Sequence, residues 1–218
     1  MTFQIHLKSK ISESELDEAT DVCVRAYVGE LASNSMVGGD ESLKDPIFRA
    51  MIRAGELAGE VYFATDDDTQ QVVGVAVWFP PGTSLFESEE QRALGFDEFM
   101  TKLSPETSAF WSNAYVPVVD KFLAEVLGAD GTRNSQYLNQ LATDPRFQRK
   151  GIATMLLKTV HNKAGISFFS ERIGRLTKIT IQFADSDTPP LFAHCAANEK
   201  NVCPFLTCHE CGTQCNNF

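Results

Sequence analysis

The hexamer Gln148-Arg149-Lys150-Gly151-Ile152-Ala153 combines two cations with two small residues. It follows a largely apolar run that ends at Thr143, and it opens an amphipathic stretch that ends at Lys163. This order predicts a strand, a turn and a helix from Gln148 to Lys163. A helix N-terminus presents several backbone N–H groups without helical partners, and these groups bind phosphate oxygens. Because glycine and alanine let a backbone come close to a ligand, the hexamer predicts a pyrophosphate site.

The two cations of the hexamer support this prediction. In the first turn of a helix, Arg149 and Lys150 would each oppose the helix dipole by about 0.3–1 kcal/mol. A bound anion would remove that conflict, and the alternative is a basic helix start that only meets solvent. The chain contains no Gly-rich dinucleotide fingerprint, no Gly-Lys-Ser/Thr loop and no Gly-x-Ser-x-Gly elbow, so the competing motifs are excluded.

The segment Leu141-Ala142-Thr143-Asp144-Pro145-x-x-Gln148-Arg149-Lys150-Gly151-Ile152-Ala153 resembles the coenzyme-binding motif of the GNAT superfamily of N-acetyltransferases. That motif is Gln/Arg-x-x-Gly-x-Gly/Ala after a strand and a Pro-containing turn. The upstream order of a strand, two helices and a hairpin is also similar to the family. The exit Pro80-Pro81-Gly82, followed by a helical insertion at about 83–130, is similar to fungal members. The resemblance covers about residues 3–164.

The resemblance implies a reaction and a set of binding residues. Acetyl-CoA would be the cosubstrate, and a primary amine would attack its thioester directly, without a covalent enzyme intermediate. The strand 138–143 would splay from its neighbour and pair with the pantetheine arm. The backbone N–H of Leu141 would polarise the thioester carbonyl. The coenzyme-binding residues would be Leu141, Ala142, Thr143, Gln148, Arg149, Lys150, Gly151, Ile152, Ala153 and Thr154.

The attacking amine must be neutral, and at neutral pH this costs about 4–5 kcal/mol for a lysine-like amine. A general base or a wet path to solvent must therefore remove a proton. The candidates on the predicted strands are Glu60, Asp66 and Asp144. Asp144 has a competing structural role, because an aspartate ahead of Pro145 commonly orders a turn.

The C-terminal part departs from the family pattern. Residues 196–202 resemble the Asn-rich turn that precedes a helix carrying the tyrosine that protonates the leaving thiolate, yet no tyrosine follows Tyr137. Either the chain is a diverged member, or its C-terminal sequence is not the natural family end. The alternative function is therefore a catalytically impaired module that binds CoA.

The predicted fold class is α/β (α+β), with a central mixed, mostly antiparallel sheet flanked by helices. A capping box at Ser12 opens one helix that stops at Gly29, and a second helix starts near Leu43. The predicted strands are 3–7, 60–65, 71–79, 136–143, 176–183 and 190–196. Residues 87–127 predict two helices, of which the second is capped by Ser104, starts at Pro105 and is kinked by Pro117.

An apolar stripe marks the second of those helices. Its members are large and mostly aromatic or β-branched: Trp111, Tyr115, Val118, Phe122 and Val126. Spacing of this kind is typical of a helix that packs on a core. The alternative is that the stripe forms a wall of the acceptor site.

We expect a single domain at 1–202 and a Cys-rich, irregular tail at 203–218. Four cysteines with two histidines nearby offer enough ligands for a zinc ion: Cys203, Cys208, Cys211, Cys215, His209 and His194. Their spacing matches known zinc motifs poorly, so we expect no metal and treat a metal-binding interaction protein as the weaker alternative.

Composition limits the partners and the compartment. The net charge of −10 argues against nucleic acid and is compatible with a cationic amine. The longest apolar run, 72–81, is too short to span a bilayer. Because the first residues lack the pattern of a secretory signal, we expect a cytoplasmic or nuclear protein without a membrane partner. The sequence specifies neither the acceptor nor the oligomeric state.

Overall fold

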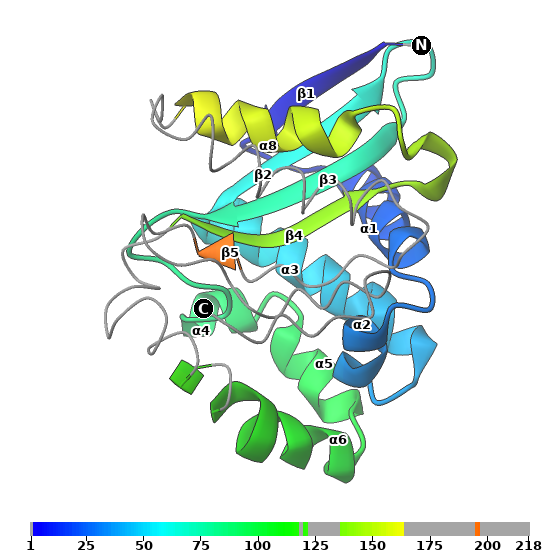
Figure 1. Cartoon of the computed structure of the whole chain (residues 1–218). Helices are drawn as coiled ribbons and strands as arrows, with labels where there is room; N and C mark the ends of the chain where they lie inside the picture. Colours follow the sequence, from blue (N-terminus) through cyan, green and yellow to red (C-terminus); the bar gives the residue numbers. More distant parts are fainter. Residues whose placement is uncertain (1, 118–119, 122–135, 164–194, 197–218) are drawn as a thin grey trace, which may run out of the picture.

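The computed structural model describes residues 2–117, 120–121, 136–163 and 195–196. Its centre is one sheet with the strand order β1-β2-β3-β4-β5, and each neighbouring pair of described strands is antiparallel (Figure 1). The predicted α/β class with a mostly antiparallel sheet is therefore confirmed. The strands are β1 (Phe3–Lys8), β2 (Glu60–Asp66), β3 (Val72–Phe79), β4 (Tyr137–Thr143) and the two-residue β5 (Cys195–Ala196).

The predicted hairpin forms the middle of this sheet. β2 and β3 pair along their length, and the turn between them is held by Asp66, whose carboxylate accepts the N–H groups of Asp68 and Thr69 at 3.0 Å each. β3 is buried at every position, as a central strand covered on both faces should be. Its Val-rich sequence suits that position because β-branched side chains pack well on a pleated surface.

Helices cover both faces of the sheet. Helices α1 (Glu13–Ala26) and α3 (Lys44–Ala58) pack on one face, and α8 (Ile152–Lys163) packs on the other (Figure 1). Alternate strand residues divide between the two cores, as the period of two in a strand requires. Val75, Val77 and Phe79 face α1 and α3, whereas Ala76 and Trp78 face α8.

The first helix starts where the sequence predicts. Ser12 and Glu15 form the complete capping box, and the side chain of Ser12 accepts the N–H of Glu15. The helix ends at Ala26, with Tyr27 as its C-cap, and is followed by a short helix that the sequence analysis missed, α2 (Leu31–Met36). Its N-cap is Glu30, which is outside the residue types that usually cap helices, and this explains why the pattern gave no signal.

The helical insertion differs from the two predicted helices. Within its described residues it contains three short helices, α4 (Glu89–Arg92), α5 (Phe96–Lys102) and α6 (Pro105–Phe110). The first predicted helix is wrong because Gly95, at φ 125°, breaks it into α4 and α5. The start of α6 is confirmed: Ser104 caps it and Pro105 is its first residue.

The kink predicted at Pro117 is replaced by a change of helix type. Trp111–Tyr115 is a π-helical turn in which the N–H of Val116 bonds the carbonyl of Trp111. A proline ring clashes with the carbonyl of the residue four positions earlier, and a wider turn ahead of Pro117 relieves that clash.

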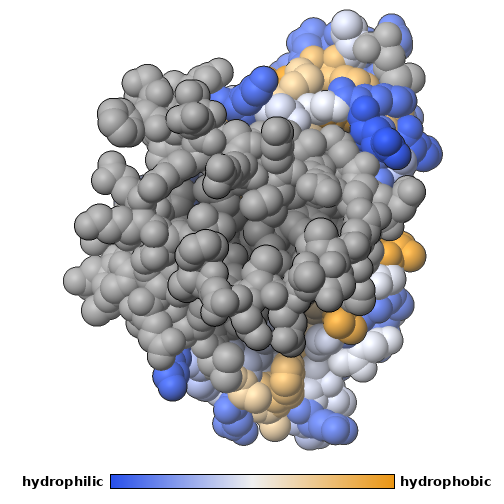
Figure 2. All heavy atoms as spheres, in the orientation of Figure 1, coloured by the Kyte–Doolittle hydropathy of each residue, from blue (hydrophilic) through white to orange (hydrophobic). Residues whose placement is uncertain are grey.

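The apolar stripe of this segment is only partly in the core. Trp111 packs against the core on the α1 side, but Phe110 and Val116 are 47% and 43% exposed. Figure 2 shows hydrophobic surface at the end of the molecule where α6 lies in Figure 1. Val118, Phe122 and Val126 lie outside the described residues, as do the predicted strand 176–183, most of 190–196 and the Cys-rich tail.

A glycine in β3 brings the start of α8 close to the sheet. A Cβ atom on Gly74 would lie 2.7 Å from Ile152 Cγ2 and 3.2 Å from the Cβ of Ala64. Gly74 also pairs with Thr143, the last residue of β4. Because Gly74 has no side chain, the N-terminus of α8 packs directly against β3, next to the end of β4.

Candidate functional site

The turn after β4 is fixed by one buried carboxylate. Asp144 is fully buried, and its Oδ1 accepts the backbone N–H of Arg146 at 3.0 Å, which caps the 3-10 helix Pro145–Phe147. The guanidinium groups of Arg146 and Arg25 each donate to Asp144 Oδ2 at 2.8 Å. Because Arg25 belongs to α1, these bonds tie the turn to the opposite face of the sheet. The structural role predicted for Asp144 is confirmed.

These bonds make the free energy of unfolding depend on pH in the acid range. Burial raises the pKa of Asp144, but hydrogen bonds from Arg146 and Arg25 outweigh it and bring the pKa from 3.8 to about 2. A carboxyl whose pKa is lower in the folded state contributes stability above its unfolded value. We therefore expect the free energy of unfolding to fall as the pH drops from about 4 through about 2. Urea unfolding at several pH values measures this, and an Asp144→Asn variant with an unchanged acid profile would contradict it.

The helix after this turn starts later than predicted. It begins at Ile152 and not at Gln148, because Arg149 and Gly151 have φ angles of 63° and 84°, which no α-helix tolerates. Arg149 and Lys150 therefore precede the helix, and the predicted opposition to the helix dipole within the first turn is wrong. The first helical bond runs from the N–H of Met155 to the carbonyl of Gly151 at 3.0 Å.

The N–H groups of Ile152, Ala153 and Thr154 consequently stand at the helix N-terminus without a partner in the helix. The approach to them is basic: Arg146, Arg149 and Lys150 are all exposed. The ammonium of Lys150 lies 4.8 Å from the centre of the Phe147 ring, which keeps it on the turn. A left-handed residue next to a right-handed one also forms a concave arrangement of N–H groups that binds anions. The geometry therefore fits a phosphate group.

Arg149 has a strained backbone conformation at the start of the basic turn. A non-glycine residue at φ 63° costs about 1 kcal/mol. We expect Arg149→Gly to raise the free energy of unfolding by about 0.5 kcal/mol, since the more flexible unfolded chain offsets part of the relief. The same change removes a cation, so the affinity for acetyl-CoA should fall about fivefold.

Chemical unfolding and calorimetric titration measure the two effects of Arg149→Gly. Gln70 offers a matched control, because it has a φ of 60° in the exposed β2–β3 turn. Gln70→Gly should relieve similar strain and leave acetyl-CoA binding unchanged. Equal losses of affinity in both variants would contradict the role of Arg149.

The outer edge of β4 faces away from β3. The N–H of Asp144 bonds the carbonyl of Val73 at 2.9 Å, which places the backbone groups of Asp144 and Ala142 toward β3. Those of Leu141 and Thr143 then point outward, since backbone groups alternate along an antiparallel strand. β5 pairs only with Tyr137 and Leu138, so among the described strands none covers this part of the edge.

The carbonyls of the outer edge have partners, which confirms their direction. The hydroxyl of Tyr27 donates to the carbonyl of Leu141 at 3.0 Å, and Gln148 Nε2 donates to the carbonyl of Thr143 at 3.4 Å. The predicted residues Leu141, Thr143 and Gln148 are therefore brought together at one edge. The outward N–H groups of Leu141 and Thr143 are the donors that this edge presents to a ligand.

Three polar side chains of β4 are buried and have polar atoms without hydrogen-bond partners in the described part of the chain. These atoms are Oγ1 of Thr143, Nδ2 of Asn139, and both Oε1 and Nε2 of Gln140, and the three residues are at most 4% exposed. A register shift against Val77 and Trp78 at Asn139 bends the strand at this point. Buried polar atoms are nearly always satisfied, and a polar ligand at β4 would supply partners for these atoms.

Tyr27 is the site residue that the sequence analysis missed. By its spacing Tyr27 falls on the apolar face of the first helix, and it is 2% exposed, with its ring 5.1 Å from that of Phe48. Its backbone carbonyl accepts from the ammonium of Lys44 at 2.8 Å. Burial raises the pKa of the Tyr27 phenol far above its ordinary value, so the hydroxyl stays protonated at physiological pH. Only the fold could reveal a contact between residues so distant in sequence.

The proposed bases do not gather at this edge. Glu60 begins β2, which β3 separates from β4, and its carboxylate accepts the hydroxyl of Tyr62 at 2.6 Å. Asp66 holds the β2–β3 turn, and Asp144 is bonded to two arginines. A route through water for the proton of the amine is therefore the alternative that this geometry favours.

The described residues contain neither a membrane-spanning helix nor a group of metal ligands. Along residues 2–117, 120–121, 136–163 and 195–196, no helix is long and apolar enough to cross a membrane. Within the same ranges, no three His, Cys, Asp or Glu side chains form a group that could hold a metal ion. The zinc alternative concerned the tail, which lies outside these ranges.

Comparison with known proteins points to one family. A family model described as an acetyltransferase (GNAT) domain matches residues 87–169, which is less than half of the chain but includes β4, the basic turn and α8. A search of curated proteins finds no match.

Two solved structures have a similar shape at low identity. One is described as histone acetyltransferase HPA2 and related acetyltransferase from Corynebacterium glutamicum ATCC 13032, with a TM-score of 0.47 and 16% identity over 75% of this chain and 72% of that chain. The other is PH1933 from Pyrococcus horikoshii OT3, with a TM-score of 0.40 and 16% identity over the same shares. At these scores neither likeness supports an inference about function.

Proposed function

We propose that this protein is a GNAT-type N-acetyltransferase that transfers an acetyl group from acetyl-CoA to a primary amine. The proposal rests on two groups of hydrogen-bond donors that follow one another along the chain. The outward N–H groups of Leu141 and Thr143 run directly into a basic turn and the N-terminus of α8 at Ile152. An elongated ligand with an amide arm and a pyrophosphate matches that sequence of donors, and the family match covers the same residues.

The chain's own residues suit each part of such a ligand. Gln148, Arg149, Lys150 and Gly151 bring the backbone and positive charge of the turn to the pyrophosphate, and Ile152, Ala153 and Thr154 supply helix N–H groups. The edge formed by Leu141, Ala142 and Thr143 pairs with the pantetheine arm as an added strand would. The unpaired hydroxyl of Thr143 gains a partner in this arrangement.

The reaction needs an oxyanion donor and a source of one proton. The amine nitrogen forms a bond to the thioester carbon, and the N–H of Leu141 stabilises the charge on the carbonyl oxygen. The carbon–sulfur bond then breaks, and the sulfur takes a proton while the new amide loses one to water. Tyr27 is the proton donor that we assign to the sulfur, because its hydroxyl already lies at the carbonyl of Leu141. Its phenolate then takes a proton from water, since burial raises the pKa of this phenol far above its ordinary value.

Acetyl-CoA binding and turnover are tested separately. At a concentration of acetyl-CoA about one hundred times its Kd, we expect stabilisation by about 2.7 kcal/mol, measured as a rise in melting temperature. Thiol release is then followed over a panel of primary amines. Stabilisation without thiol release from any amine would reject the enzyme and support a module that only binds CoA. No stabilisation would reject both.

A further inference from the structure

Arg25 lies in the last turn of α1 and reaches across to the end of β4. Its Nε and Nη2 donate to Oδ2 of Asp144 at 3.1 Å and 2.8 Å. Its Nη1 lies 3.6 Å from the carboxylate of Asp21, one turn earlier on the same helix. All three nitrogens of the guanidinium therefore face carboxylates. Because Asp144 is fully buried, water screens this ion pair less than it screens an ion pair on the surface.

Asp144 carries the contact from α1 into the basic turn. Its Oδ1 accepts the backbone N–H and the Nε of Arg146 at 3.0 Å each, and its carbonyl accepts the N–H of Phe147 at 2.8 Å. Its own N–H bonds the carbonyl of Val73 on β3. The position of Asp144 therefore sets where the chain leaves the sheet and how the 3-10 helix begins. The turn that leads to Gly151 and α8 starts from this fixed point.

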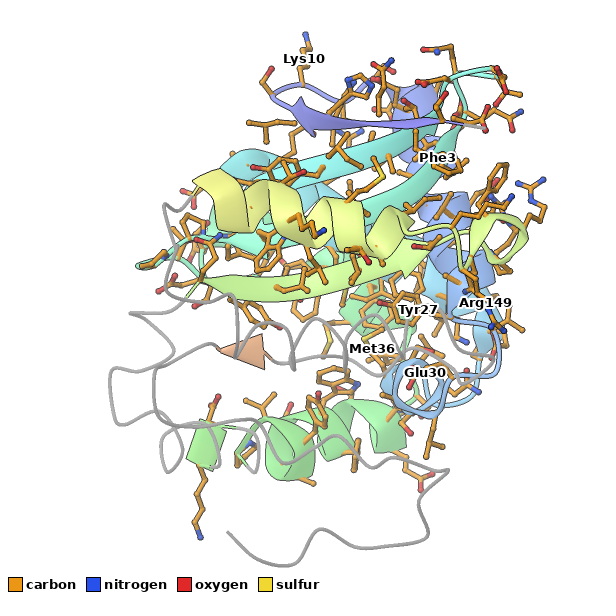
Figure 3. All side chains as sticks on the ribbon, turned by 45° about the horizontal axis from the view of Figure 1, so that its top comes forward. Phe3, Lys10, Tyr27, Glu30, Met36 and Arg149 are labelled. Carbon is orange, nitrogen blue, oxygen red and sulfur yellow. The ribbon has the colours of Figure 1, made fainter. Side chains whose placement is uncertain are left out.

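The end of α1 holds β4 at a second point. The hydroxyl of Tyr27, the C-cap of α1, donates to the carbonyl of Leu141. The contacts made by Arg25 and Tyr27 thus reach β4 on either side of Thr143. β5 pairs with the start of β4 only, so among the described strands none holds this part of its outer edge. Figure 3 shows Tyr27 and Arg149 beside the end of β4 that leads into the turn. The end of α1 therefore fixes an edge that a neighbouring strand would otherwise fix.

We infer that Arg25 is a positioning residue of the acetyl-CoA site, which acts through Asp144 to hold the basic turn in the conformation that receives the pyrophosphate. The inference rests on the proposed acetyl-CoA binding and adds a residue from outside the strand, turn and helix that would contact the ligand. Backbone N–H groups bind an anion well only if they are fixed before it arrives, because ordering them on binding costs free energy. Arg25 itself does not touch the ligand, since its three nitrogens already face Asp144 and Asp21.

The test removes the donors of Arg25 and keeps most of the length of its side chain. We expect Arg25→Met to raise the Kd for acetyl-CoA about tenfold, measured by calorimetric titration. Arg25→Lys keeps one cationic group for Asp144 and should raise the Kd only about threefold. In steady-state kinetics, the KM for acetyl-CoA should rise in both variants, and the KM for the amine should stay unchanged.

Arg49→Met is the matched control. Arg49 on α3 ties that helix to α1 much as Arg25 ties α1 to the turn, because its Nη2 donates to Asp17 at 2.6 Å. The two arginine side chains are similarly exposed, at 31% and 39%. Arg49→Met should lose comparable stability in urea unfolding and keep the wild-type Kd for acetyl-CoA. Equal rises of Kd in the two Met variants would show that Arg25 acts only through general stability, and this would overturn the inference.

A double-mutant cycle tests whether Arg25 acts through Asp144. Asp144→Asn keeps an oxygen that can accept the N–H of Arg146 and removes the negative charge that pairs with Arg25. We expect Arg25→Met to change the Kd for acetyl-CoA by less than about twofold once Asp144 has been replaced. Losses of affinity that multiply in the double variant would show that Arg25 acts independently of Asp144, and they would overturn the inference.

Failure of this inference differs from failure of the proposed function. If wild-type protein binds acetyl-CoA and Arg25→Met binds it equally well, the inference alone is rejected. Wild-type protein that binds no acetyl-CoA rejects the proposed function and the inference with it. Should Arg25→Met fail to fold, Arg25→Lys decides, because it keeps the positive charge, and a wild-type Kd in that variant also rejects the inference.

Discussion

Gly151→Ala is expected to weaken acetyl-CoA binding about 30-fold while costing about 1 kcal/mol of stability. Gly151 has a φ of 84°, a conformation that an alanine adopts only with strain. No atom lies within 4 Å of the position of an added Cβ, so the stability loss comes from the backbone alone. The larger effect falls on binding, because the methyl group and the relaxed backbone would both disturb the N–H groups that meet the pyrophosphate. Calorimetric titration and chemical unfolding measure the two quantities.

Gly82 provides the matched control for this substitution. It has a φ of 91° and equally open surroundings, but it follows β3 and lies outside the proposed coenzyme site. Gly82→Ala should lose about 1 kcal/mol of stability and keep full affinity for acetyl-CoA. If the two variants bind acetyl-CoA equally well, the turn at Gly151 does not hold the pyrophosphate.

Tyr27→Phe is expected to lower kcat about 100-fold with little change in the KM for acetyl-CoA. The change removes the hydroxyl at the carbonyl of Leu141 and keeps the ring that packs on Phe48. It also leaves a buried carbonyl without its partner, so about 1 kcal/mol of stability should be lost. Steady-state kinetics separate the two effects. A proton donor has a signature that a structural role lacks: the lost rate is smaller with an acyl thioester whose thiol is more acidic.

Tyr62 is the matched control for Tyr27. Its hydroxyl is bonded to Glu60 on β2, which is separated from β4 by β3. Tyr62→Phe should lose a similar hydrogen bond and keep kcat. A kcat for Tyr27→Phe within twofold of wild type would remove Tyr27 from the mechanism.

The order of the elements could be predicted because it depends on local chemistry. The capping box at Ser12, the hairpin of strands 60–65 and 71–79 and the proline start of α6 are all encoded locally, and all three are confirmed. The position of the basic turn between β4 and α8 was predicted for the same reason. Each of these features depends on propensities that act over one turn of the chain.

The start of α8 could not be placed from the pattern alone. Residues 148–151 contain no apolar residue that marks a helix start, and no residue type there reports that Arg149 adopts a left-handed conformation. The Asp144 side chain holds the 3-10 turn, and its two partners are Arg146 in the turn and Arg25 on α1. The contact with Arg25 depends on the tertiary fold. The break at Gly95 was missed because an isolated glycine also occurs inside helices.

Other contacts around β4 and α2 depend entirely on the tertiary fold. Tyr27 meets Leu141, and Trp111 meets Met36, across long separations in sequence. The burial of Glu30 could not be predicted, because a glutamate after a helix is usually a surface residue. Its burial without a cationic partner in the described residues becomes visible only when the fold closes around it.

The most direct test of coenzyme binding at this turn is an amide NMR titration of the protein with acetyl-CoA. We predict saturable shifts that are largest at the N–H groups of Leu141, Thr143, Ile152, Ala153 and Thr154, because these groups gain hydrogen bonds to the ligand. Desulfo-CoA should reproduce the shifts at the three helix amides. Saturating acetyl-CoA that leaves these five amides unmoved would contradict the account, whether or not it binds elsewhere.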